Sequence, residues 1–439
     1  MTDIIIDPVT RISGNARVRV YLDEDDSLQR VDFQAFGYRG FDQIAEGAHA
    51  DNLLSIVSRI CGGDSLFHQM AAAAAVEKAV GYTPPEGAIR LRELAMWAQL
   101  FERHAVSLTM HSLPDLLFPS SDPGVRNIIS IYRVDEEVVR RVLKLKSLGT
   151  AVLREAGGAP VHAVNFVPGG ALKDLTEERK KSLIQRLNDA KPLLVETGRL
   201  IKLLLRRNEE AVNTLGINPT SYLSIKGEED IVLMGDRLEA VGPEGESLGI
   251  LQPAETAARV SEKDNATSHI KGVTLSEIGE VRVGPLARLN INRRYGTQLA
   301  DTELEEIKTH WGFPIHHSMI SHAARITEMI HAWEKMIEIL SKPPGGVTRR
   351  ELPLTAGTGV AVVEGPEGIF IYRLVLNEEG LVEELNITSP LQLNLGVMEG
   401  SLEESARNLL GGAELGERTR NRLEMAVRAY APCTLCGVH

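Results

Sequence analysis

The last ten residues of the chain, 430–439, carry side chains whose types and spacing suit a metal ion. Cys433 and Cys436 stand three positions apart, and His439 follows three positions later. Thiolate and imidazole groups are donors that zinc and other thiophilic metals prefer. The spacing allows both sulfur atoms to face one ion, but two thiolates do not complete a site.

The only other cysteine, Cys61, lies near the opposite end of the 439-residue chain. Asp64 stands three positions after it, where a second cysteine would repeat the C-terminal pattern. A site built from both motifs would have three sulfur donors and one oxygen donor. The alternative is three buried, unreactive cysteines and a solvated Asp64. Because every cysteine falls in one of two aligned motifs, we favour the metal site, which folding must then assemble.

The overall composition excludes several classes of function. A net charge of −12 argues against nucleic acid as the main partner, because binding to phosphates needs clustered Lys and Arg. No run approaches the ~20 apolar residues of a membrane span, and no signal peptide is evident. Three cysteines do not form an ordinary disulfide framework, which indicates a reducing, cytoplasmic setting.

The elements that must position these motifs are mainly helices. Apolar periodicity predicts long helices over most of the chain and small β segments elsewhere, a mainly α (α+β) fold in a single large domain, 1–439. Three ranges favour strands: an N-terminal β segment at 1–40, a peripheral insert with short strands at 216–296, and a β hairpin at 359–388 that turns near 377–380.

Motifs along the whole chain carry a family resemblance. They include Asp7-Pro-Val-Thr-Arg-Ile, Tyr38-Arg-Gly-Phe-Asp42, Arg59-Ile-Cys61-Gly, Glu102-x-His104, Gly284-Pro-Leu-Ala-Arg288-Leu-Asn290 and Gln392-x-Asn394-Leu395. With these motifs in this order, the chain resembles the large (α) subunit of nickel–iron hydrogenases, in particular the soluble multimeric branch. The resemblance implies a helical bundle and the reaction H2 = 2 H+ + 2 e−. It also implies a small partner subunit that carries iron–sulfur clusters, and further electron-transfer subunits.

The resemblance assigns roles to the two cysteine motifs. Cys61 and Cys433 would be terminal nickel ligands, Cys436 would bridge nickel and iron, and Cys433 would be the first proton acceptor. The other bridging position falls on Asp64, where the family has a cysteine. A carboxylate is a harder donor than a thiolate and binds nickel more weakly. The substitution therefore bears directly on the chemistry.

Two further assignments surround the centre. The family binds magnesium or a similar ion near the C-terminus, and the matching positions are Asp42 and His439. His68, one turn beyond Asp64 on the same helix, would hydrogen-bond a ligand sulfur and help to hold the cofactor.

Other departures cluster at the same expected site. The proton-relay glutamate of the family falls on Ser13, which cannot store a proton near neutral pH. After Pro366, the arginine that lies over the metals becomes Glu367, a reversal of charge. The hydroxyl donor to the iron's diatomic ligands falls on Leu391, and the aspartate before Pro-Cys is Ala431. Buried acceptors without donors cost about 1–3 kcal/mol each, so an unmodified iron carbonyl–cyanide centre is not expected.

The sequence thus predicts a hydrogenase-type large subunit with an altered or absent nickel–iron centre and weak or no H2 activity. Two alternatives remain open. One is a scaffold or electron-transfer subunit with a single metal or an empty site. The other is a redox site for a different small substrate, such as a sulfur compound.

Overall fold

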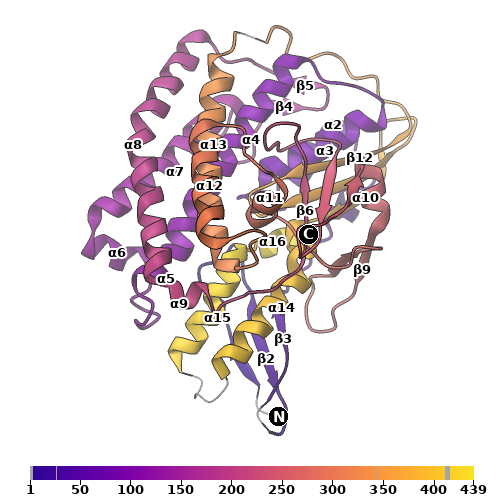
Figure 1. Cartoon of the computed structure of the whole chain (residues 1–439). Coiled ribbons are helices and arrows are strands. Elements are labelled where there is room, and N and C mark those ends of the chain that lie inside the picture. Colours follow the sequence, from indigo (N-terminus) through magenta and orange to yellow (C-terminus); the bar gives the residue numbers. More distant parts are fainter. Residues whose placement is uncertain (1–2, 26, 344, 411–415) are drawn as a thin grey trace.

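The computed structural model describes residues 3–25, 27–343, 345–410 and 416–439, and it shows a helical bundle with sheets along one side (Figure 1). The long helices of the bundle are α4 (Glu86–Val106), α7 (Glu136–Gly157), α8 (Glu177–Arg207), α12 (Gln298–Trp311) and α13 (Ser321–Ser341). The predicted mainly α fold with small β segments is confirmed. No helix within the described ranges combines the length and the apolar character that crossing a membrane requires.

The remaining helices are shorter or lie outside the bundle. They are α1 (Phe41–Ala45), α2 (Ala50–Val57), α3 (Ser65–Ala79), α5 (Leu113–Leu117), α6 (Ile128–Val134), α9 (Glu209–Val212), α10 (Pro253–Arg259), α11 (Pro285–Ile291), α14 (Pro390–Leu410), α15 (Glu417–Tyr430) and α16 (Thr434–Gly437). A π-helical turn at Ser107–Ser112 joins α4 to α5, and a 3₁₀ turn at Ser318–Ile320 precedes α13.

Helix α3 is the central element, because it is buried along almost its whole length and lies against the sheet that contains β12 (Gly357–Glu364). Two glycines of β12 allow this close approach. A Cβ at Gly359 would lie 1.9 Å from the carbonyl oxygen of Ala75, and a Cβ at Gly357 would lie 2.0 Å from that of Ala79. This packing fixes the C-terminal end of α3, and Asp64 is the N-cap residue at the other end of the helix.

The range predicted as a hairpin, 359–388, forms three strands instead of two. β12, β13 (Ile369–Leu376) and β14 (Val382–Thr388) pair antiparallel in that order. The prediction missed the first turn, because residues 365–368 were interpreted only as a family motif. They form a tight turn in which the Gly365 amide donates to the Gly368 carbonyl at 2.7 Å. The second turn lies at 377–380, as predicted.

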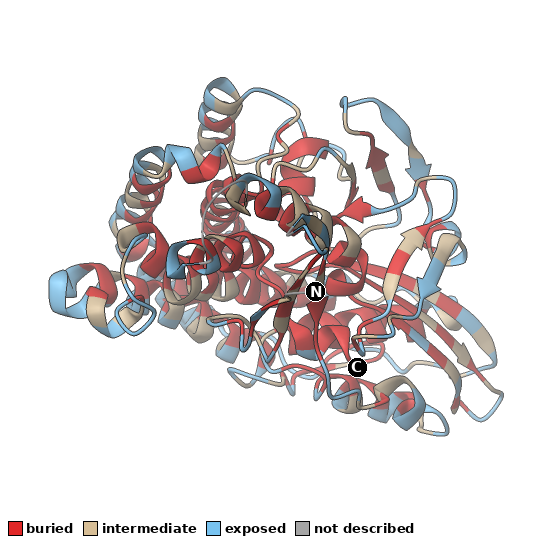
Figure 2. Ribbon diagram, turned by 90° about the horizontal axis from the view of Figure 1, so that it is seen from below, coloured by how far each residue is buried: buried red, intermediate tan, exposed pale blue. Residues whose placement is uncertain are grey.

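The range 216–296, which we expected to be a peripheral insert, packs against the core through its strands and keeps exposed residues at its turns. Its strands are β6 (Ser221–Ile225), β7 (Leu238–Val241), β8 (Ser247–Leu251), β9 (Val260–Lys263), β10 (Gly272–Leu275) and β11 (Val281–Arg282). Their apolar side chains share one cluster with those of β12 and β13. Residues 281–292 are all buried, and burial extends through the centre of the molecule (Figure 2).

The segment that joins β1 (Ile4–Ile6) to β2 (Arg17–Leu22) contacts the C-terminal loop beside the metal-ligand motif. The N-terminal strands β1, β2 and β3 (Leu28–Gln34) form an antiparallel sheet that packs against α14 and α15 (Figure 1). Between β1 and β2 the chain crosses the C-terminal loop, where the Thr434 amide donates to the Ser13 carbonyl at 2.9 Å. A Cβ at Gly14 would lie 2.1 Å from Thr434 Oγ1, so this crossing requires glycine. The remaining short strands, β4 (Phe166–Val167) and β5 (Gly170–Ala171), form a separate pair.

Candidate metal centre

The structure brings the two cysteine motifs together into one buried cluster. The ligand atoms of Cys61, Asp64, Cys433 and Cys436 all lie within 4.8 Å of one another, and within the described ranges this is the one group of three or more such side chains. Cys433 Sγ lies 3.3 Å from Cys61 Sγ and 3.2 Å from Cys436 Sγ. Asp64 Oδ2 lies 3.4 Å from Cys436 Sγ and 3.6 Å from Cys61 Sγ.

Secondary structure explains how each ligand is placed. Cys61 lies in the loop between α2 and α3, and Asp64 caps α3. Cys433 is the N-cap residue of the short helix α16, and Cys436 lies within that helix. Ala431 precedes them in the left-handed region at φ 51°, which turns the chain sharply after α15. The predicted metal ligands therefore converge although the two motifs are 372 residues apart.

Burial and close acidic neighbours shift the pKa values of the cluster. Hydrogen bonds from the Cys433 and Cys436 thiols lower the pKa of Cys61, whereas burial raises the pKa of Cys436. Burial, followed by the negative charge of Glu367, raises the pKa of Asp64 well above its ordinary value. Acidic groups that crowd a buried site in this way favour a bound cation, because it offsets their mutual repulsion.

Arg103 is the functional residue that sequence reasoning missed. It reaches the cluster from α4, and its Nη2 lies 2.8 Å from Glu367 Oε1 and 3.1 Å from Ser13 Oγ. Its Nε forms an ion pair with Asp64 Oδ1 at 3.3 Å. Burial alone would lower the pKa of Arg103, but the carboxylates of Asp64 and Glu367 hold it well above its usual value.

Arg103 changes the interpretation of Glu367, which the resemblance places at the family's arginine. The carboxylate lies on the turn between β12 and β13 and is paired with a guanidinium from α4. The feature of the sequence that could have indicated this pair is the position of Arg103, between the two residues of the Glu102-x-His104 motif. Its neighbour His104 points to a different partner, Glu328, at 2.7 Å.

Hydrogen bonds from the buried Arg288 hold the turn that carries Glu367 in place. Arg288 donates to the carbonyl oxygens of Gly365 and Pro366 at 3.0 and 3.4 Å. Arg288 is itself held by Glu328 at 2.7 and 2.8 Å. Pro366 thus contributes its backbone carbonyl to the support of the turn.

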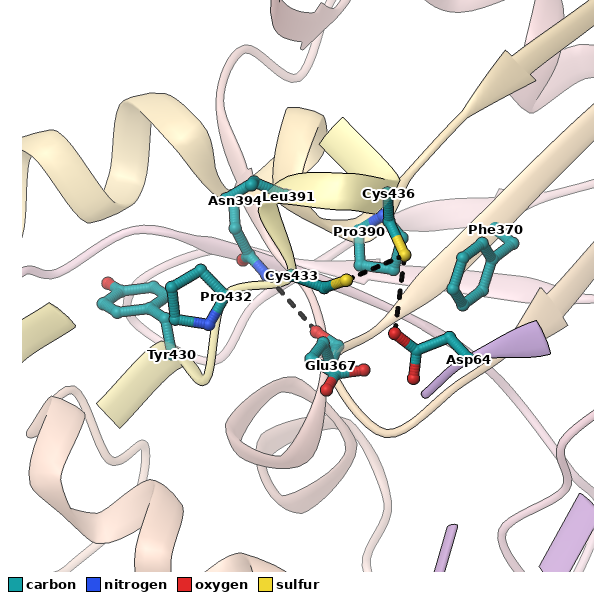
Figure 3. A pocket seen from close by; sticks show the side chains of 10 residues that line it. All are labelled: Asp64, Glu367, Phe370, Pro390, Leu391, Asn394, Tyr430, Pro432, Cys433 and Cys436. Atoms are coloured by element: carbon teal, nitrogen blue, oxygen red, sulfur yellow. Dashed lines mark hydrogen bonds between the residues drawn. The ribbon is translucent and has the colours of Figure 1, made fainter. Parts of the chain in front are cut away.

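A small cavity lies beside the cysteines, on the side of Glu367 and Leu391 (Figure 3). Its volume is about 10 Å³, about the room that one water molecule needs. It is lined by Asp64, Glu367, Phe370, Pro390, Leu391, Asn394, Tyr430, Pro432, Cys433 and Cys436. The side-chain amide of Asn394 is already engaged by the carbonyls of Val283 and Glu367, both at 3.4 Å.

The donors present decide which metal group fits. Three sulfurs and one carboxylate oxygen suit one thiophilic ion such as nickel. The side that faces Leu391 and Glu367 presents an apolar group and a carboxylate, which do not stabilise anionic diatomic ligands on a second ion. The residues therefore fit a single thiolate-bound metal and do not fit an iron carbonyl–cyanide group.

His68 lies next to the cluster on α3. Its Nε2 is 3.4 Å from Cys436 Sγ, and its Nδ1 is 2.7 Å from the Tyr372 hydroxyl. Burial lowers the pKa of His68 to about 3, so the ring is neutral at ordinary pH. The tyrosine O–H can donate to Nδ1, which leaves the Nε2–H to donate to the sulfur.

Asp42, on α1, lies close enough to His439 for its charge to act on the histidine ring. His439 Nδ1 is 2.9 Å from the Cys436 carbonyl, and Asp42 Oδ1 accepts from the Tyr38 hydroxyl at 3.2 Å. Burial lowers the pKa of His439, and the charge of Asp42 acts in the opposite direction. The pair does not belong to a larger group of ligating side chains in the described part of the chain, so the magnesium site stays a prediction.

Comparisons with known proteins agree on one family. Residues 39–113 match the profile of the nickel-dependent hydrogenases, and residues 3–36 match a profile described as HoxL-like. One subunit of the F420-non-reducing hydrogenase vhu of Methanocaldococcus jannaschii is 30% identical over 93% of this chain and 99% of the relative. The beta subunit of the NAD-reducing hydrogenase HoxS of Cupriavidus necator is 28% identical over 99% and 94%. A crystal structure of NAD+-reducing [NiFe]-hydrogenase in the H2-reduced state superposes with a TM-score of 0.95, at 26% identity and full coverage of both chains.

Proposed function

Because the chain belongs to the nickel-dependent hydrogenase large-subunit family, we propose that it is the metal-bearing large subunit of a hydrogenase-type oxidoreductase complex with weak or no H2 activity. The observation that carries the proposal is the buried cluster of three cysteines and Asp64. In the family, the nickel–iron centre supplies the redox chemistry of H2 = 2 H+ + 2 e−, whereas the residues of this chain fit a single thiolate-bound metal. The cluster keeps three of the four cysteine positions that the resemblance implies. At the fourth position it has the Asp64 carboxylate, which is a harder donor and binds nickel more weakly.

The residues around the cluster argue against rapid proton transfer. Cys433 is the first proton acceptor in the role that the family resemblance implies, and Ser13 is the next group at the family's relay position. The Ser13 oxygen accepts a hydrogen bond from Arg103 at 3.1 Å. A serine hydroxyl has no second protonation state near neutral pH, so it cannot take the proton and hold it. Proton departure from Cys433 would therefore be slow.

The partners follow from the relatives. Two of the similar proteins are named as subunits of F420-non-reducing and NAD-reducing hydrogenases. We expect this chain to pair with a small subunit that carries iron–sulfur clusters and to transfer electrons through further subunits, which determine the electron acceptor. A magnesium or similar ion between Asp42 and His439, and a cytoplasmic location, belong to the same proposal.

The direct test is anaerobic H2-dependent dye reduction by the purified complex. A positioned proton acceptor contributes about 10²–10⁴-fold to a rate, so the activity should fall below that of an ordinary family member by about this factor. The NAD-reducing hydrogenase of Cupriavidus necator, assayed in parallel, provides the reference. Equal rates for the two complexes would refute the proposal of weak activity.

A second candidate function is a scaffold or electron-transfer subunit with one metal ion or none. It is favoured by the small cavity beside Leu391 and Glu367, which offers no suitable donors to a second ion with anionic ligands. Elemental analysis with infrared spectroscopy separates the two. Equimolar nickel and iron with bands of bound CO and cyanide support the H2 enzyme. Zinc, iron alone or an empty site supports the scaffold.

A redox site for another small substrate, such as a sulfur compound, also agrees with the altered ligand set. It predicts turnover with that substrate and not with H2. Activity assays against candidate sulfur compounds separate it from the scaffold.

A further inference from the structure

The two oxygens of Asp64 face different partners. Oδ2 points to the sulfurs of Cys436 and Cys61, at 3.4 and 3.6 Å. Oδ1 faces Arg103 Nε at 3.3 Å and has no hydrogen bond among the residues that the structure describes. The carboxylate therefore offers one oxygen to the centre of the cluster while the other is held by the guanidinium.

Glu367 is held by the same guanidinium. Its Oε1 accepts from Arg103 Nη2 at 2.8 Å, and its Oε2 is buried without a hydrogen-bond partner in the described ranges. Both carboxylates project toward the space beside the cysteines (Figure 3). Without the guanidinium, Glu367 and the second oxygen of Asp64 would be available to a bound metal ion.

The position of the guanidinium depends on Gly63. A Cβ at Gly63 would lie 2.7 Å from Arg103 Cζ and 2.8 Å from its Nη1. The side chain of Arg103 thus lies against the loop that joins Cys61 to Asp64, and only glycine leaves room for it. The side chain of Arg103 is only 11% exposed, so its guanidinium is fixed between this loop and the turn that carries Glu367.

From this geometry we infer that Arg103 sets the metal selectivity of the site, which rests on the proposed metal centre. It is a positioning residue: it engages Asp64 Oδ1 and Glu367 Oε1, so that at most one oxygen of each carboxylate is left for the metal. Three sulfurs then outnumber the oxygens around the ion, which favours a thiophilic metal. If both carboxylates were released, the site would favour a hard cation such as Mn²⁺.

The test compares the complex carrying the Arg103→Met substitution with the wild type. Both are produced in medium with equal Ni²⁺ and Mn²⁺, and the metals per chain are measured by elemental analysis, with Mn²⁺ also measured by electron paramagnetic resonance. Changes in groups that orient metal ligands alter affinity by about 10–100-fold. We expect the Mn²⁺-to-Ni²⁺ ratio to rise by about this factor in Arg103→Met.

Three further variants separate selectivity from folding. Arg103→Met/Glu367→Gln removes the released carboxylate and should bring the ratio back toward the wild-type value. Arg103→Lys keeps the charge but lacks the planar fork, so it should raise the ratio even where Arg103→Met does not fold. Arg92→Met removes another buried arginine of α4, three turns before Arg103, and should leave the ratio unchanged.

The possible outcomes are distinct. An unchanged ratio in folded Arg103→Met or Arg103→Lys overturns the inference while the metal centre stands. An equal rise in Arg92→Met also overturns it, because the effect would then come from general loosening of α4. A wild-type complex that holds no metal at the cluster overturns both the proposed metal centre and the inference.

Discussion

Helix α4 carries two buried arginines that pair with acidic residues, and the two pairs differ in how completely the acids are satisfied. Arg92 binds Glu77 through both terminal nitrogens, at 2.7 and 2.9 Å. The Gly169 amide also donates to Glu77 at 2.8 Å, so both carboxylate oxygens are occupied. Arg103, 11 residues later, faces two carboxylates, each of which keeps one buried oxygen without a hydrogen bond in the described part of the chain.

The two groups differ in whether any carboxylate oxygen remains without a hydrogen bond, and this distinguishes a pair that supports helix packing from a group that belongs to the candidate site. The closed pair at Arg92 joins α3 to α4 and leaves no oxygen for a ligand. The open group at Arg103 holds α3 and the turn after β12 together but keeps oxygens next to three thiols. Buried polar atoms without partners are rare in native proteins and call for an explanation. We propose that the explanation is a metal site whose oxygen donors are limited by the Arg103 guanidinium.

The largest expected effect on stability comes from breaking the closed pair. Arg92→Met leaves the Glu77 carboxylate buried without its partner, which costs about 3–5 kcal/mol of unfolding free energy. The thermal and denaturant midpoints of the complex should both fall. Arg140→Met, which removes an exposed pair on α7, should lower the midpoints far less, because solvent screens an exposed pair. If the two variants lose equal stability, the distinction between the closed buried pair and a surface pair fails.

A smaller effect is expected where α3 lies against β12. Gly359→Ala places a methyl group 1.9 Å from the Ala75 carbonyl, so the helix or the strand must move. Overpacking of this kind costs about 1–3 kcal/mol, measured as a lower denaturant midpoint. Because α3 carries both Glu77 and Asp64, the variant should also reduce the metal content per chain. Gly249→Ala is a control for adding a methyl group at a glycine with open space, and there only backbone strain is expected.

A third effect is a pH dependence of stability that comes from α14 and not from α4. Glu399 on α14 accepts from the Phe33 amide at 2.8 Å, and burial raises its pKa to about 8. The folded state then binds the proton more tightly than the unfolded state, whose carboxyl group titrates near ~4.5. The contribution to stability is therefore complete below ~4.5 and is lost as the pH rises through about 8.

The measurement for Glu399 is the thermal midpoint between pH 5 and pH 9. Glu399→Gln keeps the acceptor for the Phe33 amide and removes the titration, so its midpoint should decline less over this range than that of the wild type. Metal content per folded chain should stay equal in the two proteins. Parallel pH profiles would show that this carboxyl group does not titrate as its burial implies.

The sequence predicted what depends on motifs and periodicity. The pairing of Cys61 with the C-terminal cysteines followed from two aligned motifs, and the long helices followed from apolar spacing. The contact of His68 with a cysteine sulfur followed from its place one turn after Asp64. These features are local, or are carried by a family pattern, so one sequence is enough to find them.

The parts that were missed depend on tertiary placement. Arg103 is one charged residue on a long helix, and only the fold brings it to Asp64 and Glu367. The range 216–296 was expected at the periphery because its strands are short and rich in glycine. Its buried apolar side chains pack against β12 and β13, which lie more than 60 residues later in the chain.

We propose that Cys61, Asp64, Cys433 and Cys436 hold one metal ion. X-ray absorption at the nickel edge of the purified wild-type complex tests this proposal. We expect nickel with three sulfur neighbours and one oxygen neighbour from the protein. Nickel with four sulfur neighbours, nickel with only nitrogen and oxygen neighbours, or no nickel at all would contradict it.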